Sequence, residues 1–203
     1  MATVTTNHRS EISDPWGVEP LRVRLSQSIE EVAAMNRDLR IEQKANGEFV
    51  MMAPAGLEGS SRNLEISYQL MGWTKKCGGK AFDCSAGFHL PDGSTLSPDA
   101  SWIAIERWNA LSNEERKTFA PICPDFVIEL RSESDRLTTL QDKMKNYLNN
   151  GIRLGWLIDP LKKQVRLYRT GTQPEVLSQP ESVSGEEVLP GFVLDLRPIW
   201  NDV

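Results

Sequence analysis

The most informative stretch of this chain is Pro124-Asp125-Phe126-Val127-Ile128-Glu129-Leu130-Arg131. Between residues 126 and 130, Glu129 alone interrupts an apolar run. Strands that are buried on both faces of a sheet have near-continuous apolar runs of this kind, whereas strands with one face in water alternate. Residues 126–130 are therefore predicted to form a buried central strand that carries a carboxylate inside it.

Helical and strand patterns are found on both sides of this run. Towards the N-terminus the predicted elements are a helix over 29–39 that begins at a capping box, a hairpin over 40–52 turned by Asn46-Gly47, a helix over 60–76, and strands over 81–85, 87–90 and 98–105. Towards the C-terminus they are a helix over 138–150 and strands over 155–158 and 164–169. In the helix over 60–76 the apolar side is predicted to consist of Leu64, Tyr68 and Met71, with Trp73. One α/β domain fits this order of elements.

Length and composition are those of an ordinary globular chain. It has 203 residues, of which 39% are hydrophobic and 25% charged. Residues 1–24 are expected to be a polar lead-in that is partly disordered, and residues 25–203 a single domain. No apolar run approaches the roughly 20 residues that span a bilayer, so no membrane partner is expected.

Cysteine and histidine usage bears on the compartment and on metals. The three cysteines, Cys77, Cys84 and Cys123, are odd in number and lack CxxC spacing, which favours reduced thiols in a cytoplasmic protein. Zinc is poorly supported, because His8 and His89 are the only histidines. The net charge of −5 argues against a protein that coats DNA with a broad basic face. It leaves a nuclease possible, since catalytic carboxylates themselves add negative charge.

Two carboxylates carry the candidate chemistry. Asp99 opens the strand over 98–105, and Glu129 lies inside the buried run thirty residues later. A buried carboxylate is costly unless it is paired. Arg131, on the same side of the strand, could pair with Glu129 in a purely structural role, and Asp99 could simply mark a turn. Together the two carboxylates could instead bind Mg²⁺ through oxygen ligands, as phosphodiester hydrolysis requires.

The helix that follows supplies a candidate basic group. Lys143 and Tyr147 are four residues apart, so they lie on one face of that helix. Lys143 could reach the end of the strand, orient a water molecule and offset phosphate charge. The alternative is a solvated lysine on a surface helix.

The second half of the chain resembles the Uma family of restriction endonucleases. The residues that carry the resemblance are Pro98-Asp99-Ala100-Ser101, the run from Pro124 to Ser132, Asp142-Lys143 with Tyr147, Gly151, the run from Gly155 to Pro160, and the run from Val188 to Phe192. The resemblance extends from about residue 25 to the C-terminus and implies a PD-(D/E)XK nuclease fold, a mixed central sheet flanked by helices. Asp99 matches the aspartate of the PD element, and Glu129 matches the acidic residue of the (D/E)XK element.

The resemblance also shows one departure. After the acidic residue, the (D/E)XK element has any residue and then a lysine. In this chain the two positions are Leu130 and Arg131, so the lysine is replaced by arginine. In related nucleases the basic residue can move to the following helix, where Lys143 is the candidate, and Arg131 is the alternative. Arginine stays protonated and binds phosphate, but it cannot accept a proton. An acidic residue from the first core helix often completes such sites, and Glu58 and Glu65 are both candidates. Ser132, Gln141 and Tyr147 are expected to contact the catalytic side chains and hold them in position, without binding the metal themselves.

The resemblance implies a Mg²⁺-dependent or Mn²⁺-dependent endonuclease that acts on DNA, with Asp99 and Glu129 as metal ligands and Lys143 as the third catalytic residue. It also implies a homodimer, since cutting two strands needs two sites. Two alternatives remain open. The missing lysine and the acidic charge fit a binding or scaffold module that keeps the nuclease fold without turnover, and the substrate could be RNA, although no RNA-binding motif is found.

Overall fold

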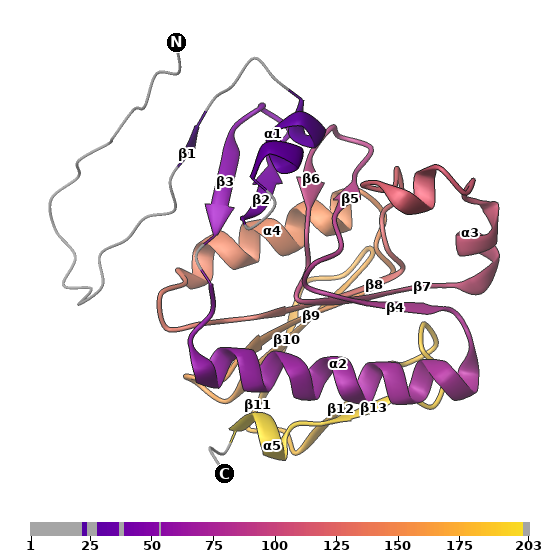
Figure 1. Cartoon of the computed structure of the whole chain (residues 1–203). Coiled ribbons are helices and arrows are strands. Elements are labelled where there is room, and N and C mark those ends of the chain that lie inside the picture. Colours follow the sequence, from indigo (N-terminus) through magenta and orange to yellow (C-terminus); the bar gives the residue numbers. More distant parts are fainter. Residues whose placement is uncertain (1–21, 24–27, 37–38, 53, 201–203) are drawn as a thin grey trace, which may run out of the picture.

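A six-stranded mixed sheet runs through the middle of the molecule (Figure 1). The computed structural model describes residues 22–23, 28–36, 39–52 and 54–200. In spatial order the strands of this sheet are β11 (Glu175–Ser178), β10 (Gln164–Arg169), β9 (Leu154–Asp159), β8 (Phe126–Leu130), β7 (Ala100–Ile103) and β4 (Lys80–Asp83). β8 is central and all five of its residues are buried, as the apolar run predicts. The expected α/β fold with a mixed sheet is confirmed.

β8 and β9 are the parallel pair of this sheet, and the helix α4 (Leu137–Asn149) connects them. Parallel neighbours need such a crossover, because a tight turn can only join antiparallel strands. α4 covers one face of the sheet through Leu140, Met144 and Tyr147, which are buried. Side chains alternate along a strand, so Val127 and Glu129 lie on the face that α4 covers, and Phe126 and Ile128 lie on the other.

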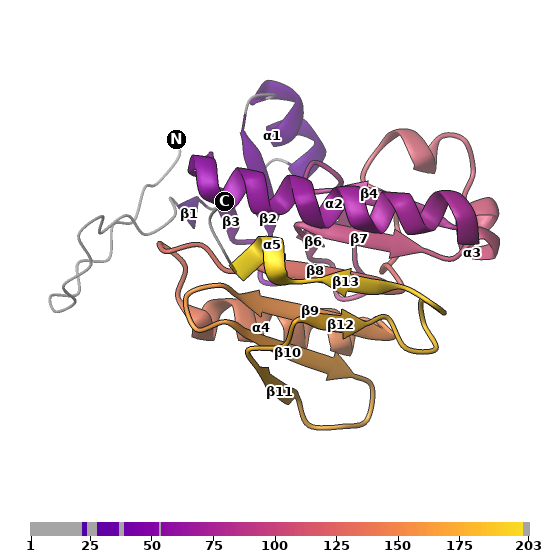
Figure 2. The ribbon, with the colours of Figure 1, turned by 90° about the horizontal axis from the view of Figure 1, so that it is seen from below.

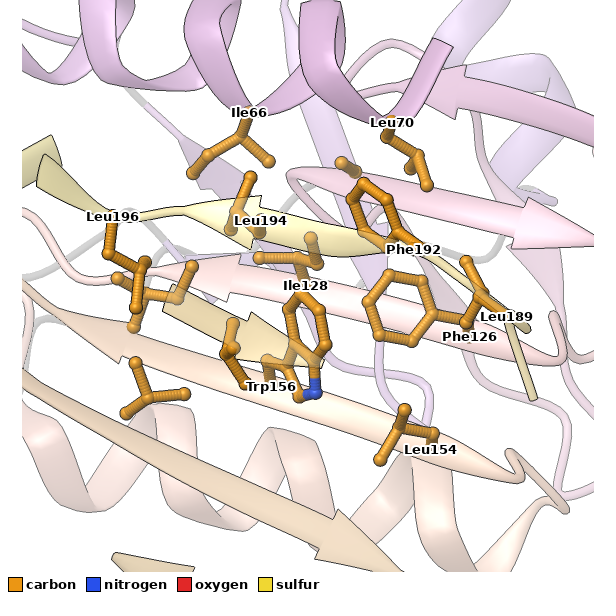
Figure 3. Close-up of a cluster of buried hydrophobic side chains, with 14 of the residues drawn as sticks. Ile66, Leu70, Phe126, Ile128, Leu154, Trp156, Leu189, Phe192, Leu194 and Leu196 are labelled. Carbon is orange, nitrogen blue, oxygen red and sulfur yellow. The ribbon is translucent and has the colours of Figure 1, made fainter. Parts of the chain in front are cut away.

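The opposite face is covered by the long helix α2 (Leu57–Cys77) and by the C-terminal elements (Figure 2). These are the small sheet of β12 (Ser182–Ser184) and β13 (Val193–Asp195), and the helix α5 (Arg197–Trp200). Figure 3 shows the core between them: Ile66 and Leu70 of α2 point towards Phe126, Ile128 and Trp156 of the sheet, with side chains of residues 189–196 filling the space between.

The buried side of α2 differs from the prediction. The structure buries Ile66, Leu70 and Thr74 and leaves Leu64 and Tyr68 exposed. The helix carries apolar residues on two sides, so periodicity alone predicted the wrong one. The sheet and the C-terminal elements cover only the side that Ile66 and Leu70 occupy.

A second sheet lies against the α4 side of the molecule. Its strands, in spatial order, are β1 (Arg22–Val23), β3 (Phe49–Met52), β2 (Arg40–Gln43), β6 (Thr95–Leu96) and β5 (Phe88–His89). β2 and β3 form the predicted hairpin, with Gly47 at a positive φ in its turn. The helix α1 (Ile29–Met35) precedes the hairpin in the chain and begins at the predicted capping box of Ser28 and Glu31. α1 ends before the predicted residue 39, and residues 37–38 lie outside the described part of the chain.

The remaining elements are α3 (Ile105–Ala110) and a 3-10 turn, η1 (Glu115–Lys117), in the connection between β7 and β8. Most of the predicted lead-in, residues 1–21 and 24, lies outside the described residues. None of the described helices combines the length and the apolar character that crossing a membrane requires.

Candidate active site

Asp99 and Glu129 meet because β7 and β8 are antiparallel neighbours. Ala100 is paired with Ile128, so Asp99, one residue before β7, lies beside the end of β8. The backbone N–H of Leu130 donates a hydrogen bond of 2.8 Å to Oδ2 of Asp99. Asp99 is 9% exposed and Glu129 only 2%. Two carboxylates are therefore held next to each other in a nearly dry environment.

Lys143 of α4 reaches this pair of carboxylates. Its Nζ lies 2.8 Å from Oε1 of Glu129 and donates a hydrogen bond of 3.2 Å to the carbonyl oxygen of Ser97. One turn further along α4, the hydroxyl of Tyr147 donates to the same Oε1 at 3.2 Å. The spacing of four residues thus brings an ammonium and a phenol to a single carboxylate.

The hairpin contributes two further charged residues, Glu42 and Arg40 of β2, which sequence reasoning missed. Oε1 of Glu42 lies 2.8 Å from Nζ of Lys143 and accepts a hydrogen bond of 2.8 Å from the backbone N–H of Ser97. Arg40 Nη1 donates to Oδ1 of Asp99 at 3.2 Å. Residues two apart on a strand share a face, so a signal was present in Arg40-Ile41-Glu42. The same pattern is common on exposed hairpins, so only burial distinguishes this one; Glu42 is 5% exposed.

We call these five residues the charged cluster: Arg40, Glu42, Asp99, Glu129 and Lys143. Three carboxylates face two cations, so the formal charge is −1 when all are ionised. Burial raises the pKa of Glu129, and the nearby charges of Asp99 and Glu42 raise it further against the attraction of Lys143, giving a pKa of about 8. The cluster is therefore short of positive charge, and a proton or another cation would stabilise it.

Lys143 remains charged in this environment. Burial by itself lowers the pKa of Lys143, but the carboxylates of Glu129 and Glu42 together outweigh burial and raise it above the ordinary lysine value. Burial and the neighbouring Glu129 also raise the pKa of the Tyr147 hydroxyl well above its usual range. Both groups consequently act as hydrogen-bond donors at neutral pH.

The alternative basic residue, Arg131, is engaged elsewhere. Its Nη1 donates to Oδ2 of Asp159, at the end of β9, at 2.9 Å, and its Nε donates to the carbonyl oxygen of Asp135. Ser132 is tied to the same loop, since both its N–H and its hydroxyl donate to Oδ2 of Asp135. The ion pair that the structure gives Arg131 is thus with Asp159 rather than with Glu129.

The other predicted supporting residues lie apart from the charged cluster. Glu58 pairs with Arg62 at 3.5 Å on the surface of α2, and Glu65 accepts a hydrogen bond of 2.9 Å from Gln69. Gln141 lies on α4. In the described part of the chain, no hydrogen bond or ion pair joins Glu58, Glu65 or Gln141 to the cluster. The third acidic residue of the cluster comes from the hairpin, as Glu42, and not from the first core helix.

Comparison with known proteins places this chain in a family. A family model described as "Uma2: Putative restriction endonuclease" matches residues 26–197. The chain belongs to the Uma2 family. Among solved structures, this Uma2 chain is similar to a protein of the DUF820 family from Anabaena variabilis ATCC 29413, whose crystal structure is described as that of a putative nuclease. The TM-score is 0.67 at 22% sequence identity, over 79% of this chain and 89% of that chain, so this likeness concerns the fold. No curated protein matches the chain.

The chemistry of the charged cluster in this Uma2 chain fits a hard divalent cation. Its acidic donors are all carboxylate oxygens, which Mg²⁺ and Mn²⁺ prefer. Among the described residues, no three His, Cys, Asp or Glu side chains lie close enough together to hold one ion. The fit is therefore to an ion bound by one or two carboxylates, with water and substrate oxygens at its other positions, which is how Mg²⁺ is commonly bound.

Arg131 of this Uma2 chain gives a prediction about stability. Replacing Arg131 with Met leaves Asp159 buried and unpaired, so the free energy of unfolding is expected to fall by about 3–5 kcal/mol. Urea unfolding measures this change. The double variant with Asp159→Asn is expected to recover much of the loss, because it removes the orphaned charge. If the Arg131→Met protein instead unfolds at the same urea concentration as the wild type, the ion pair with Asp159 does not contribute to stability.

Proposed function

We propose that this protein is a Mg²⁺-dependent or Mn²⁺-dependent endonuclease that hydrolyses DNA phosphodiester bonds. Asp99 and Glu129 are the proposed metal ligands, and Lys143 is the proposed third catalytic residue. The observation that supports this proposal best is the charged cluster itself, in which buried carboxylates exceed buried cations beside the ends of β7 and β8. An excess of buried negative charge destabilises the folded protein. A role of these carboxylates in binding a metal ion would explain why they are present.

The divalent ion, when bound, would neutralise phosphate charge and make a water molecule a better nucleophile. The chain's own residues would position the groups around it. The hydroxyl of Tyr147 and the ammonium of Lys143 hold Glu129 in place through Oε1. The N–H of Leu130 holds Asp99 through Oδ2. Both carboxylates are thus oriented before substrate arrives, and this preorganisation is what makes electrostatic catalysis effective.

Lys143 and Arg40 are the proposed contacts to the phosphate. Because the pKa of Lys143 is raised, this residue can donate a hydrogen bond to a phosphate oxygen or to the attacking water, but it is not a proton acceptor at neutral pH. Among the described residues, Arg40 Nε is buried and has no hydrogen-bond partner. The Arg40 side chain as a whole is 28% exposed, so other parts of its guanidinium are open to an approaching phosphate. Arginine is well suited to this contact, because its guanidinium is always charged and binds phosphate with several N–H groups.

The presence of Lys143 in the cluster favours turnover over a silent scaffold. The scaffold interpretation rested on the missing lysine of the (D/E)XK element, and Lys143 supplies an ammonium 2.8 Å from the acidic residue of that element. The proposal also includes a homodimer, so that two sites can act on two strands, and the cytoplasm as its location. The cysteines Cys77, Cys84 and Cys123 are free thiols in the structure, in keeping with a reducing compartment.

A cleavage assay tests the proposal. Purified protein is incubated with supercoiled plasmid, linear duplex, single-stranded DNA and structured RNA, with Mg²⁺, Mn²⁺ or EDTA. We expect cleavage of DNA with either ion and loss of cleavage in EDTA. Cleavage of RNA alone would establish a ribonuclease instead. No cleavage of any substrate, together with no divalent-ion binding by calorimetry at millimolar concentrations, would favour the scaffold.

A further inference from the structure

The outer side of α2 carries a line of large apolar side chains. Its members are Leu57, Leu64, Tyr68 and Met71, with exposed fractions of 92%, 72%, 72% and 40%. We call these four residues the α2 stripe. Single exposed apolar residues are common on proteins, but four large ones along one helix are unusual and mark an interaction surface.

The spacing of the α2 stripe is that of a helix-packing seam. Positions 57, 61, 64, 68, 71 and 75 are separated alternately by four and three residues, which is the spacing of the a and d positions of a coiled coil. Ser61 and Lys75 occupy the two positions without an apolar residue. α2 has 21 residues and so extends about 30 Å at 1.5 Å per residue. The seam thus runs along the whole helix, on the side opposite to the buried Ile66 and Leu70.

We propose that a second copy of this chain covers the α2 stripe, with the two α2 helices packed antiparallel about a two-fold axis near residue 66. In this register Leu64 of one copy lies against Tyr68 of the other, and Ser61 lies against Met71. Ser61, the small residue of the seam, then faces a large one. A two-fold axis makes the contact self-complementary, so the assembly closes as a dimer.

The charges beside the stripe specify the antiparallel direction. The first half of α2 carries Glu58, Arg62 and Glu65, with a net charge of −1, and its end carries Lys75 and Lys76, with a charge of +2. Parallel packing would place Glu58 beside Glu58 and the lysines beside the lysines. Antiparallel packing places Glu58 of one copy beside Lys75 and Lys76 of the other, twice in each dimer. The helix dipoles also oppose each other in the antiparallel arrangement, which is the favourable sense.

The dimer surface does not depend on the proposed nuclease activity, because neither the α2 stripe nor its flanking charges belong to the charged cluster. Self-association is therefore measured without nucleic acid or divalent ions. A failure here would leave the proposed activity intact, and an inactive protein could still form this dimer.

Sedimentation velocity on the full chain tests the surface. The wild type is expected to sediment as a dimer at tens of micromolar, and Leu64→Glu and Tyr68→Glu are each expected to weaken association at least about 100-fold, since central interface residues dominate affinity. Leu161→Glu is the matched control: Leu161 is a 49% exposed leucine in the turn after β9, outside the stripe, and its replacement should leave the dimer unchanged. Circular dichroism checks that each variant is folded.

Disulfide trapping tests the direction of packing, in a Cys77→Ser background that removes the exposed thiol of α2. The combination Ser61→Cys with Met71→Cys should form a covalent dimer rapidly under mild oxidation. Ser61→Cys alone should not, because antiparallel packing separates the two copies of residue 61 by roughly 15 Å along the axis. A monomeric wild type, a dimer that both Leu64→Glu and Tyr68→Glu leave intact, or efficient trapping by Ser61→Cys alone would each overturn the proposal. A monomer in which another segment of the same chain covers the stripe counts among these.

Discussion

Replacing Glu129 with Gln is expected to reduce metal-dependent cleavage at least about 100-fold and, at the same time, to stabilise the metal-free protein at neutral and alkaline pH. The loss of activity follows from the loss of a negative ligand for the ion, and a factor of 100 corresponds to about 2.7 kcal/mol of transition-state stabilisation. The gain in stability follows from charge balance. Without the carboxylate of Glu129, two acids face two bases in the charged cluster.

The stabilisation depends on pH in a defined direction. An unfolded glutamate loses its proton near its ordinary pKa of 4.5, whereas Glu129 in the folded protein keeps its proton up to a pKa of about 8. Between these values the folded state holds more protons than the unfolded state, so wild-type stability falls as pH rises through this window. The glutamine variant resembles the protonated acid at every pH. Its advantage should therefore grow from about pH 4.5 and level off above pH 8 at roughly 4–5 kcal/mol, since the two pKa values differ by about 3.5 and a difference of one corresponds to about 1.4 kcal/mol.

Cleavage rates and urea unfolding in EDTA, both measured between pH 5 and pH 9, test this prediction. The groups that face Glu129 are Lys143, Tyr147, Asp99, Glu42 and Arg40, and none of them is altered. Glu133→Gln is the control, because Glu133 is an exposed glutamate only four residues further along the chain. It should change neither activity nor stability. Equal activity of the Glu129→Gln variant and the wild type would remove Glu129 from the catalytic site.

Replacing Lys143 with Met is expected to have the opposite effect on stability. It leaves Glu129 and Glu42 buried with no ammonium between them, and breaking a buried ion pair by removing one partner costs about 3–5 kcal/mol. The loss should be largest in EDTA at pH 8 and smaller in saturating Mg²⁺, because the ion replaces some of the missing positive charge. Cleavage by the folded fraction should also fall, because the proposed phosphate contact is gone.

Lys145→Met is the matched control, since Lys145 lies two residues away on α4 and forms an exposed ion pair with Asp142 at 2.8 Å. Exposed pairs contribute roughly 0–1 kcal/mol, so this variant should unfold close to the wild type. Thermal and urea unfolding with and without Mg²⁺ measure both variants. A Lys143→Met protein as stable as Lys145→Met would show that the buried contacts of Lys143 do not hold in solution.

Local patterns identified most of the fold. The apolar run around Ile128 predicted a central strand, and β8 is buried throughout. Asn46-Gly47 predicted the hairpin, which the structure contains. These features depend on residues that are near each other in the chain, where strand and helix periodicity act directly. The same local reasoning predicted Lys143 and Tyr147 on one helix face, and the structure brings both to Glu129.

Contacts between elements that are distant in the chain could not be predicted from the sequence. Glu42 and Arg40 reach Lys143 and Asp99 only because the second sheet lies against the α4 side of the molecule. Arg131 is paired with Asp159 because β9 is the parallel neighbour of β8, 28 residues further along the chain.

The buried side of α2 was likewise determined by tertiary packing. Apolar residues occupy two sides of that helix, and the elements that pack against it cover only one of them. By itself, then, the sequence determined the central strand and the acidic residue within it. The tertiary structure decided which other charges surround that residue, because a period of 2 or 3.6 sets the face of each element but not which faces meet.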